Sequence, residues 1–345
     1  MTDAPDPRAG LLAAKLGALV RGQWGSAADD AVAGPFPGGA TLVDASGSVG
    51  WVLLDGTADA SRRLGGALAV AVRAGVQELH LLVDDAAEAG ILARRGDLFA
   101  QPPTVWTVSG RDLAPASAAA PAVDAAPAPE AELYRVVLQA AGLEVVVEGG
   151  HMVGEYLGLE VARVVVDPDG GAHVEAGVGR FDREVGAMMF AELAEADALS
   201  RAVAAVAEVR TPGAGRHQLN QLVPERWLRS VLVAQPQLVG AQALRSVGST
   251  LPRRNLKESG IATAVGSDLD GNPVVVTCST GVDLELVPGA ADDRLTHAPD
   301  ARLILAVPAR DALPITTNLA SHLAVPASVV TIDDAWRAGF SGGAS

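Results

Sequence analysis

The basic residues of this chain are concentrated in one segment, residues 210–257. The segment holds seven arginines and one lysine against the single acid Glu225, so its formal charge is +7, whereas the whole 345-residue chain carries −15. Clustered guanidinium and ammonium groups bind phosphate, and charge asymmetry within a chain is typical of an anion-binding surface. The segment is therefore a candidate nucleic-acid interface.

The residues between these cations fit the same chemistry, because histidine, tryptophan and amide side chains can stack on or hydrogen-bond to a bound strand. The candidate contacts are Arg216, His217, Arg226, Trp227, Arg229, Arg253, Arg254 and Lys257. A second interpretation stays open. The arginines could instead pair with acidic surfaces of the neighbouring units and form a seam between them.

Other chemistries lack their motifs. The chain has no Gly-x4-Gly-Lys-Ser/Thr loop, and Gly177-Val-Gly179 lacks the third glycine of a dinucleotide fingerprint, so no nucleotide cofactor is expected. Six histidines show no pair at helical ligand spacing, and one cysteine cannot build a thiolate zinc site. Cys278 and Ser279 follow a predicted strand, but without Gly-x-Ser-x-Gly they are interpreted as a buried thiol and a turn serine.

A spacing of Asp-x-x-Gly-x11-Asp occurs three times. The Asp and Gly suit the first and fourth positions of a type I turn between two strands, and the last Asp stands where a helix N-cap belongs. We interpret the aspartates as structural and the frame as a hairpin-plus-helix unit. The three copies are Asp44, Gly47 and Asp59; Asp167, Gly170 and Asp182; and Asp268, Gly271 and Asp283.

The frame divides the chain into three α/β units, of which the first and last are predicted to be duplicates. Between residues 40–108 and 264–332, at a constant offset of 224, sixteen of sixty-nine positions are identical. The expected divisions are a first unit (1–113), an Ala/Pro linker (114–130), a middle unit (131–209), a basic connecting segment (210–260) and a second copy of the first unit (261–340).

Periodicity and turn signals predict the elements inside these units. The first unit is read as helix, hairpin, helix, strand, helix, strand, and the middle unit as helix, strand, hairpin, helix. The expected helices are 11–20, 61–74, 86–99, 131–141 and 185–209, and the expected strands are 40–43, 51–54, 79–83, 104–108, 143–147, 159–166 and 172–178.

This order, together with the block Gly158-Leu-Glu160 to Glu175, resembles the restriction-endonuclease-like nucleases. The resemblance implies that acids on two hairpin arms hold a divalent metal such as Mg²⁺ and activate water. Glu160 and Glu175 match those acids, and Glu155 would join them as a metal ligand. Gly177 occupies the position of the family's lysine, so the resemblance indicates either a degenerate member or an unrelated α/β protein.

Three functional hypotheses follow. The leading one is a cytoplasmic nucleic-acid-associated protein of nuclease-like architecture, lacking the usual active site, whose basic segment contacts phosphates. The alternative is a non-catalytic scaffold or protein-interaction protein. A weaker alternative is a metal-dependent hydrolase that uses Glu160 and Glu175. An acidic chain with no long apolar run is not expected to bind anionic membranes.

Overall fold

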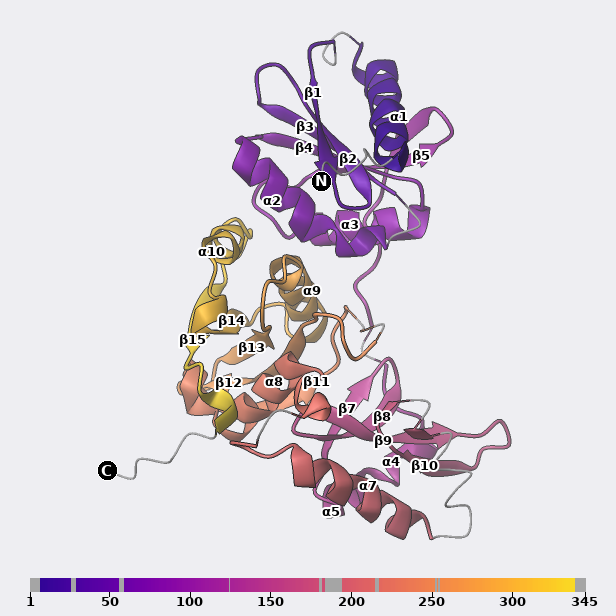
Figure 1. Cartoon of the computed structure of the whole chain (residues 1–345), viewed down its shortest axis with the longest axis vertical. Helices are drawn as coiled ribbons and strands as arrows, with labels where there is room; N and C mark the ends of the chain where they lie inside the picture. Colours follow the sequence, from indigo (N-terminus) through magenta and orange to yellow (C-terminus); the bar gives the residue numbers. More distant parts are fainter. Residues whose placement is uncertain are drawn as a thin grey trace. The chain divides into compact units, whose positions relative to one another are not determined.

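The computed structural model describes residues 7–25, 29–55, 59–123, 125–179, 182–183, 194–214, 217–251, 253 and 255–338. These residues form a mixed α/β structure with three sheets (Figure 1). It divides into two compact units, one of residues 1–121 with 314–327 and the other of residues 122–313 with 328–345. The boundary between the units at residues 121 and 122 falls inside the predicted Ala/Pro linker.

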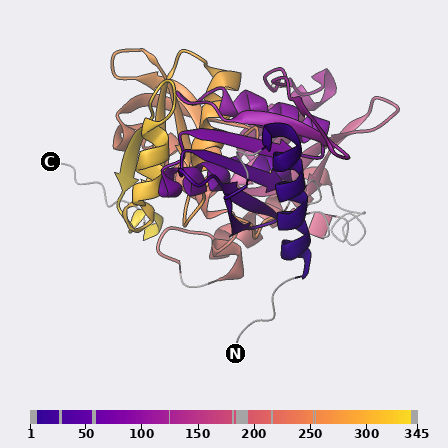
Figure 2. The same ribbon diagram turned by 90° about the horizontal axis from the view of Figure 1, so that it is seen from above.

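The first unit is built on a six-stranded sheet in the order β1-β2-β3-β4-β5-β6. The pairs β3–β4 and β4–β5 are parallel and the others are antiparallel. Helix α1 lies against this sheet, where it contacts β2 and β3 (Figures 1 and 2). The elements are α1 (Pro7–Trp24), β1 (Val32–Phe36), β2 (Gly39–Val43), β3 (Val49–Leu54), α2 (Leu64–Ala74), β4 (Glu78–Val83), α3 (Ala86–Gly96), β5 (Thr104–Ser109) and β6 (Asp112–Pro115).

The predicted hairpin turn is confirmed. The N–H of Gly47 donates to the carbonyl of Asp44 at 3.0 Å, and Gly47 has a φ of +76°, which suits glycine. The capping role predicted for Asp59 is wrong for α2. Asp59 precedes a short 3₁₀ turn, Ala60–Arg62, and makes no side-chain cap bond to it, while α2 begins after Arg63.

Three of the five tryptophans surround His80 in the core of this unit. The ring of His80 lies 4.9 Å from that of Trp24 and 6.0 Å from that of Trp51, and its Nδ1 accepts a hydrogen bond from Trp106 at 3.2 Å. Burial lowers the pKa of His80. This histidine is therefore a core residue that favours the neutral form.

One helix of the first unit comes from the far end of the chain. Helix α10 (Pro314–Ser321) contacts α2, and the backbone just after it pairs with the backbone just after α3. Ala100 N–H donates to His322 at 2.9 Å and Ala324 N–H donates to Leu98 at 2.8 Å. These two bonds form a reciprocal antiparallel bridge whose two sides are 224 residues apart.

The second unit contains a four-stranded antiparallel sheet in the order β10-β9-β8-β7. Helices α4, α5 and α7 contact its strands. The predicted hairpin is β9 and β10, while β8 was not predicted, and part of the predicted helix 185–209 lies outside the described residues. The elements are α4 (Pro129–Glu132), α5 (Arg135–Ala140), β7 (Glu144–Glu148), β8 (His151–Tyr156), β9 (Leu159–Val166), β10 (Ala172–Ala176) and α7 (Glu195–Val209).

The second unit also contains a five-stranded sheet in the order β11-β12-β13-β14-β15. As in the first sheet, an antiparallel hairpin, β12–β13, is followed by two parallel pairs. Asp283 accepts a hydrogen bond from Glu285 N–H at 2.9 Å at the entry to α9. The elements are α8 (Pro224–Ala234), β11 (Ala241–Val247), β12 (Ala262–Asp268), β13 (Pro273–Cys278), α9 (Leu286–His297), β14 (Arg302–Pro308) and β15 (Ser328–Ile332).

A buried carboxylate holds this second sheet to its helix α9. Asp293 is fully buried and accepts hydrogen bonds from the N–H of Thr250 at 2.6 Å and from the hydroxyls of Ser249, Thr250 and Thr263. Burial raises the pKa of Asp293, and these hydrogen bonds oppose that shift. No helix in the described part of the chain is both long and apolar enough to cross a membrane.

Candidate functional site

The basic segment is folded rather than a connecting loop. Pro224 stands in the first turn of α8, where its missing N–H costs no hydrogen bond, and Trp227, Leu228 and Leu232 bury one face of that helix. β11 then pairs with β12 as the edge of the five-stranded sheet. The segment therefore supplies a helix and a strand to the second unit.

Two of its arginines bind one buried carboxylate. Glu155, in β8, is 1% exposed, and its two oxygens accept hydrogen bonds from Arg226, at 2.8 Å, and from Arg229. Arg226 also contacts Glu148 at 2.7 Å. Charges inside a protein are tolerated when they are paired and hydrogen-bonded, and this cluster meets both conditions. It joins the antiparallel sheet to α8.

The turn before β9 presses against the start of the same helix. Gly158 has a φ of +77°, and a Cβ built on it would lie 2.3 Å from the carbonyl carbon of Arg226. The carbonyl of the adjacent Leu157 accepts two hydrogen bonds from Arg210, at 2.9 and 3.1 Å. A glycine is therefore required at position 158 for both its backbone angle and its lack of a side chain.

Arg253, like Arg226 and Arg229, is paired with a buried carboxylate. Its guanidinium lies 2.6 Å from the carboxylate of Glu225, which is 1% exposed, and it also donates to backbone carbonyls at positions 255 and 258. Burial raises the pKa of Glu225, while the Arg253 charge lowers it. The one acid of the basic segment is thus paired inside that segment.

The eight predicted nucleic-acid contacts consequently separate into three groups. Arg226, Arg229 and Arg253 are held in ion pairs and Trp227 is buried. His217 and Lys257 are exposed. Arg216 and Arg254 lie outside the described residues.

The predicted metal ligands are also paired with arginine. Glu160 binds Arg163 and Arg183, each at 2.9 Å, and Arg183 lies 3.6 Å from Glu175, so the two acids share a cation. Glu155 belongs to the separate cluster with Arg226. Within the ranges that the structure describes, no group of three or more His, Cys, Asp or Glu residues is arranged to hold a metal ion.

Cys278 lies inside the second unit and has no exposed surface. Burial raises the pKa of its thiol to about 12, so the thiolate that a nucleophile requires is not populated near neutral pH. The neighbouring Ser279 is 1% exposed, and its hydroxyl approaches the carbonyl of Gly260 at 3.5 Å. The interpretation of Cys278 as a buried thiol is confirmed.

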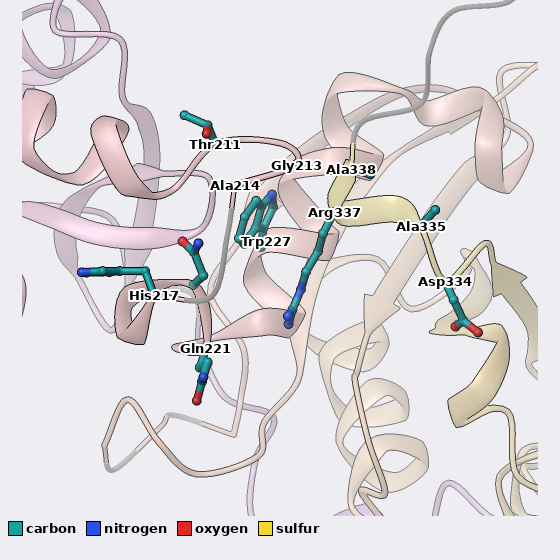
Figure 3. A pocket seen from close by; sticks show the side chains of 11 residues that line it. Thr211, Gly213, Ala214, His217, Gln221, Trp227, Asp334, Ala335, Arg337 and Ala338 are labelled. Atoms are coloured by element: carbon teal, nitrogen blue, oxygen red, sulfur yellow. The ribbon is translucent and has the colours of Figure 1, made fainter.

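A cavity of about 420 Å³ lies beside the start of α8 (Figure 3). Its walls come from the loop 211–214, from the 3₁₀ turn that follows His217 and from a second 3₁₀ turn, Trp336–Ala338. The side chains that line it include Thr211, His217, Asn220, Gln221, Trp227, Asp334 and Arg337. Of the predicted contacts, the cavity therefore brings together His217 and Trp227.

No protein-family model, curated protein or solved structure matches this chain.

The residue that sequence analysis missed is Arg337. It lies eighty residues beyond Lys257, outside the basic segment, and only the fold brings it to Trp227. The neighbouring Trp336 was a possible signal, since an arginine next to tryptophan often stacks on an aromatic face.

Proposed function

We propose that this protein is a non-catalytic scaffold or protein-interaction protein, and that its basic segment cross-links the two sheets of the second unit. The observation that carries the proposal is the Glu155 carboxylate, which is buried and shared by Arg226 and Arg229. Arginines committed to a buried acid are not available to phosphates. The acids that would hold a catalytic metal are engaged by arginine as well.

The test replaces Arg229 by methionine, which keeps the length of the side chain and removes its charge. Removing one partner of a buried ion pair costs about 3–5 kcal/mol, so urea unfolding should show a loss of that order. The matched control is Arg245→Met, because Arg245 is an exposed arginine of the same segment. Equal stability of the two variants would reject the cross-link.

Association with nucleic acid is the second candidate function, supported by the segment's charge of +7 and by the exposure of His217 and Lys257. It predicts salt-sensitive binding of DNA or RNA that weakens in Lys257→Gln. The two candidates predict different measurements. The cross-link predicts that Arg229→Met lowers stability, whereas the nucleic-acid interface predicts that Lys257→Gln lowers the affinity for DNA or RNA at low salt. The absence of binding at low salt would remove this candidate.

The metal-dependent hydrolase stays a prediction that depends on Glu160 and Glu175. A metal that bound only the folded protein would raise its melting temperature. If titration with Mg²⁺ or Mn²⁺ produced neither stabilisation nor cleavage of nucleic acid, the hydrolase would be excluded.

We also propose that the first and third sheets derive from a duplicated module. In both sheets one antiparallel pair, β2–β3 or β12–β13, is followed by two parallel pairs. The register of the last parallel pair is also the same: His80 pairs with Thr104, and Ile304 pairs with Ser328, so both positions differ by 224. The two hairpins differ in register by one residue, since Ala40 pairs with Leu53 whereas Ala264 pairs with Val276. The reciprocal bridge after α3 and α10 supports the same origin, because it joins equivalent positions of the two sequences, as an isologous contact between two copies of one module does.

A further inference from the structure

Two guanidinium groups without a carboxylate partner stack on Trp227, a residue that lines the cavity beside α8. Arg210 is 0% exposed and donates to carbonyls of Leu157, Leu219 and Leu222. Arg337 lines the cavity itself. No carboxylate of the described chain lies within ion-pair distance of either guanidinium, in contrast to Arg226, Arg229 and Arg253.

Two tryptophans hold these guanidiniums in place. Arg210 Cζ lies 4.6 Å from the ring centroid of Trp227, and Arg337 Cζ lies 4.8 Å from that of Trp336 and 5.8 Å from that of Trp227. The two rings meet edge to face with centroids 6.0 Å apart. Stacking on an aromatic face fixes a guanidinium but uses none of its in-plane N–H donors. Arg337 Nε has no hydrogen-bond partner among the described residues.

The electrostatics at this point are unbalanced. Burial, and after it the charge of Arg337, lowers the pKa of Arg210 to about 10, and the more distant charges of Glu155 and Glu225 oppose this shift only in part. Burial and the charge of Arg310 lower the pKa of Arg337, and the charges of Asp311 and Glu225 likewise oppose that shift only in part. Both shifts mean that the charged form of each side chain is disfavoured where it stands. A bound anion would offset this cost, since an opposite charge favours the charged form.

One wall of the cavity, the loop 211–214, is fixed to the backbone of Arg337. Gly213 N–H donates to the carbonyl of Arg337 at 3.0 Å, which ties the loop 211–214 to the C-terminal 3₁₀ turn. Figure 3 shows Arg337 and Trp227 side by side, with Gln221 below them and the side chain of His217 directed away to the left. A volume of about 420 Å³ is within the range of small-molecule sites, roughly 300–1,000 Å³.

We propose that this cavity binds the phosphate or carboxylate group of a small organic anion, with Arg337 as the principal contact. A guanidinium presents paired N–H donors that match the two oxygens of such a group. Thr211, Asn220 and Gln221 add hydroxyl and amide groups that suit a polar ligand. Asp334, which also lines the cavity, and the acidic chain as a whole disfavour a long polyanion, so a small ligand fits better than a nucleic acid.

The test is titration of the full-length protein with sodium phosphate and with sodium acetate, at constant ionic strength adjusted with NaCl. Indole N–H resonances and tryptophan fluorescence report binding, because Trp227 and Trp336 both contact Arg337. We expect saturable changes with at least one anion. Arg337→Gln should weaken that binding about tenfold or more, since a charged hydrogen bond contributes about 1.5–3 kcal/mol.

Two further variants sharpen the result. Arg337→Lys keeps the charge and loses the paired donors, so its affinity should fall between those of wild type and Arg337→Gln. Arg302→Gln, at the exposed start of β14, is the matched control and should bind as wild type does.

Three outcomes would overturn the proposal. These are the absence of saturable change with either anion, binding that Arg337→Gln leaves intact, and tighter Arg337-dependent binding of a single-stranded oligonucleotide than of either small anion. Urea unfolding of Arg337→Gln separates lost binding from lost folding. The Arg229→Met experiment does not bear on this cavity, so the two proposals can fail independently.

Discussion

The guanidinium of Arg226 donates a hydrogen bond of 2.8 Å to the buried carboxylate of Glu155, although the two residues lie seventy-one positions apart in the chain. The contact joins α8 to β8.

Glu155→Gln should lower the free energy of unfolding by about 3 kcal/mol or more. The substitution keeps the shape of the side chain but leaves the guanidinium of Arg229, which is 1% exposed, without its counter-charge. Urea denaturation measures the loss. The control is Glu208→Gln, because Glu208 lies on the exposed side of α7. A loss no larger than that of the control would show that the cluster contributes nothing to stability.

Gly158→Ala should destabilise the protein more than Gly170→Ala. Both glycines have positive φ, +77° and +87°, so both substitutions carry a backbone cost of about 1–2 kcal/mol. Only at position 158 would the new Cβ also meet backbone, 2.3 Å from the carbonyl carbon of Arg226; at Gly170 it meets open space. Melting temperatures of the two variants compare these effects, and equal values would mean that the β8–β9 turn does not need this close approach.

Asp293 should give the second unit a characteristic dependence on pH. Its folded-state pKa is raised by burial, so the folded protein holds a proton that the unfolded chain releases at about pH 4. The contribution of Asp293 to stability is therefore full below about pH 4 and falls as the pH rises toward the folded pKa. The measurement is unfolding free energy against pH for wild type and Asp293→Asn. Wild type should lose stability relative to the variant with rising pH, and a relative gain would contradict the raised pKa.

Ala324→Pro should lower the stability of the first unit by about 1–3 kcal/mol. The substitution removes the N–H that donates to Leu98 at 2.8 Å and leaves that carbonyl unpaired. Ala324→Gly is the control, because it keeps the N–H. If the bridge is two-fold symmetric, Ala100→Pro should have a similar effect, since Ala100 N–H makes the matching bond. Proline and glycine variants of equal stability would refute a role for the bridge.

Turn chemistry explains most of what could be predicted from the sequence. Asp followed by Gly at the fourth turn position located all three hairpins, and Gly47, Gly170 and Gly271 all have positive φ. β1 was missed because Val32-Ala-Gly-Pro-Phe36 is rich in residues that normally interrupt strands. β8 was missed because the acidic Glu155 interrupts its apolar pattern, and only a distant pair of arginines makes its burial tolerable.

The candidate sites were harder to predict, because they depend on contacts between distant segments. A cluster of arginines looks alike in sequence whether it faces solvent or a buried acid, and which partner each one has is decided by tertiary packing. Arg226 and Arg337 illustrate the limit. The first belongs to the basic cluster and is paired with glutamates, whereas the second is isolated in sequence and lines a cavity.

The membership of α10 in the first unit has a consequence for synthesis. Because residues 314–327 belong to a unit that otherwise ends at residue 121, that unit cannot be completed until residue 327 has been synthesised. Before that point, α2 lacks its contact with α10. The Leu98 carbonyl and the Ala100 N–H also lack the hydrogen bonds that they make in the folded unit. The first unit therefore completes its fold only after residues 122–313 of the second unit have been synthesised.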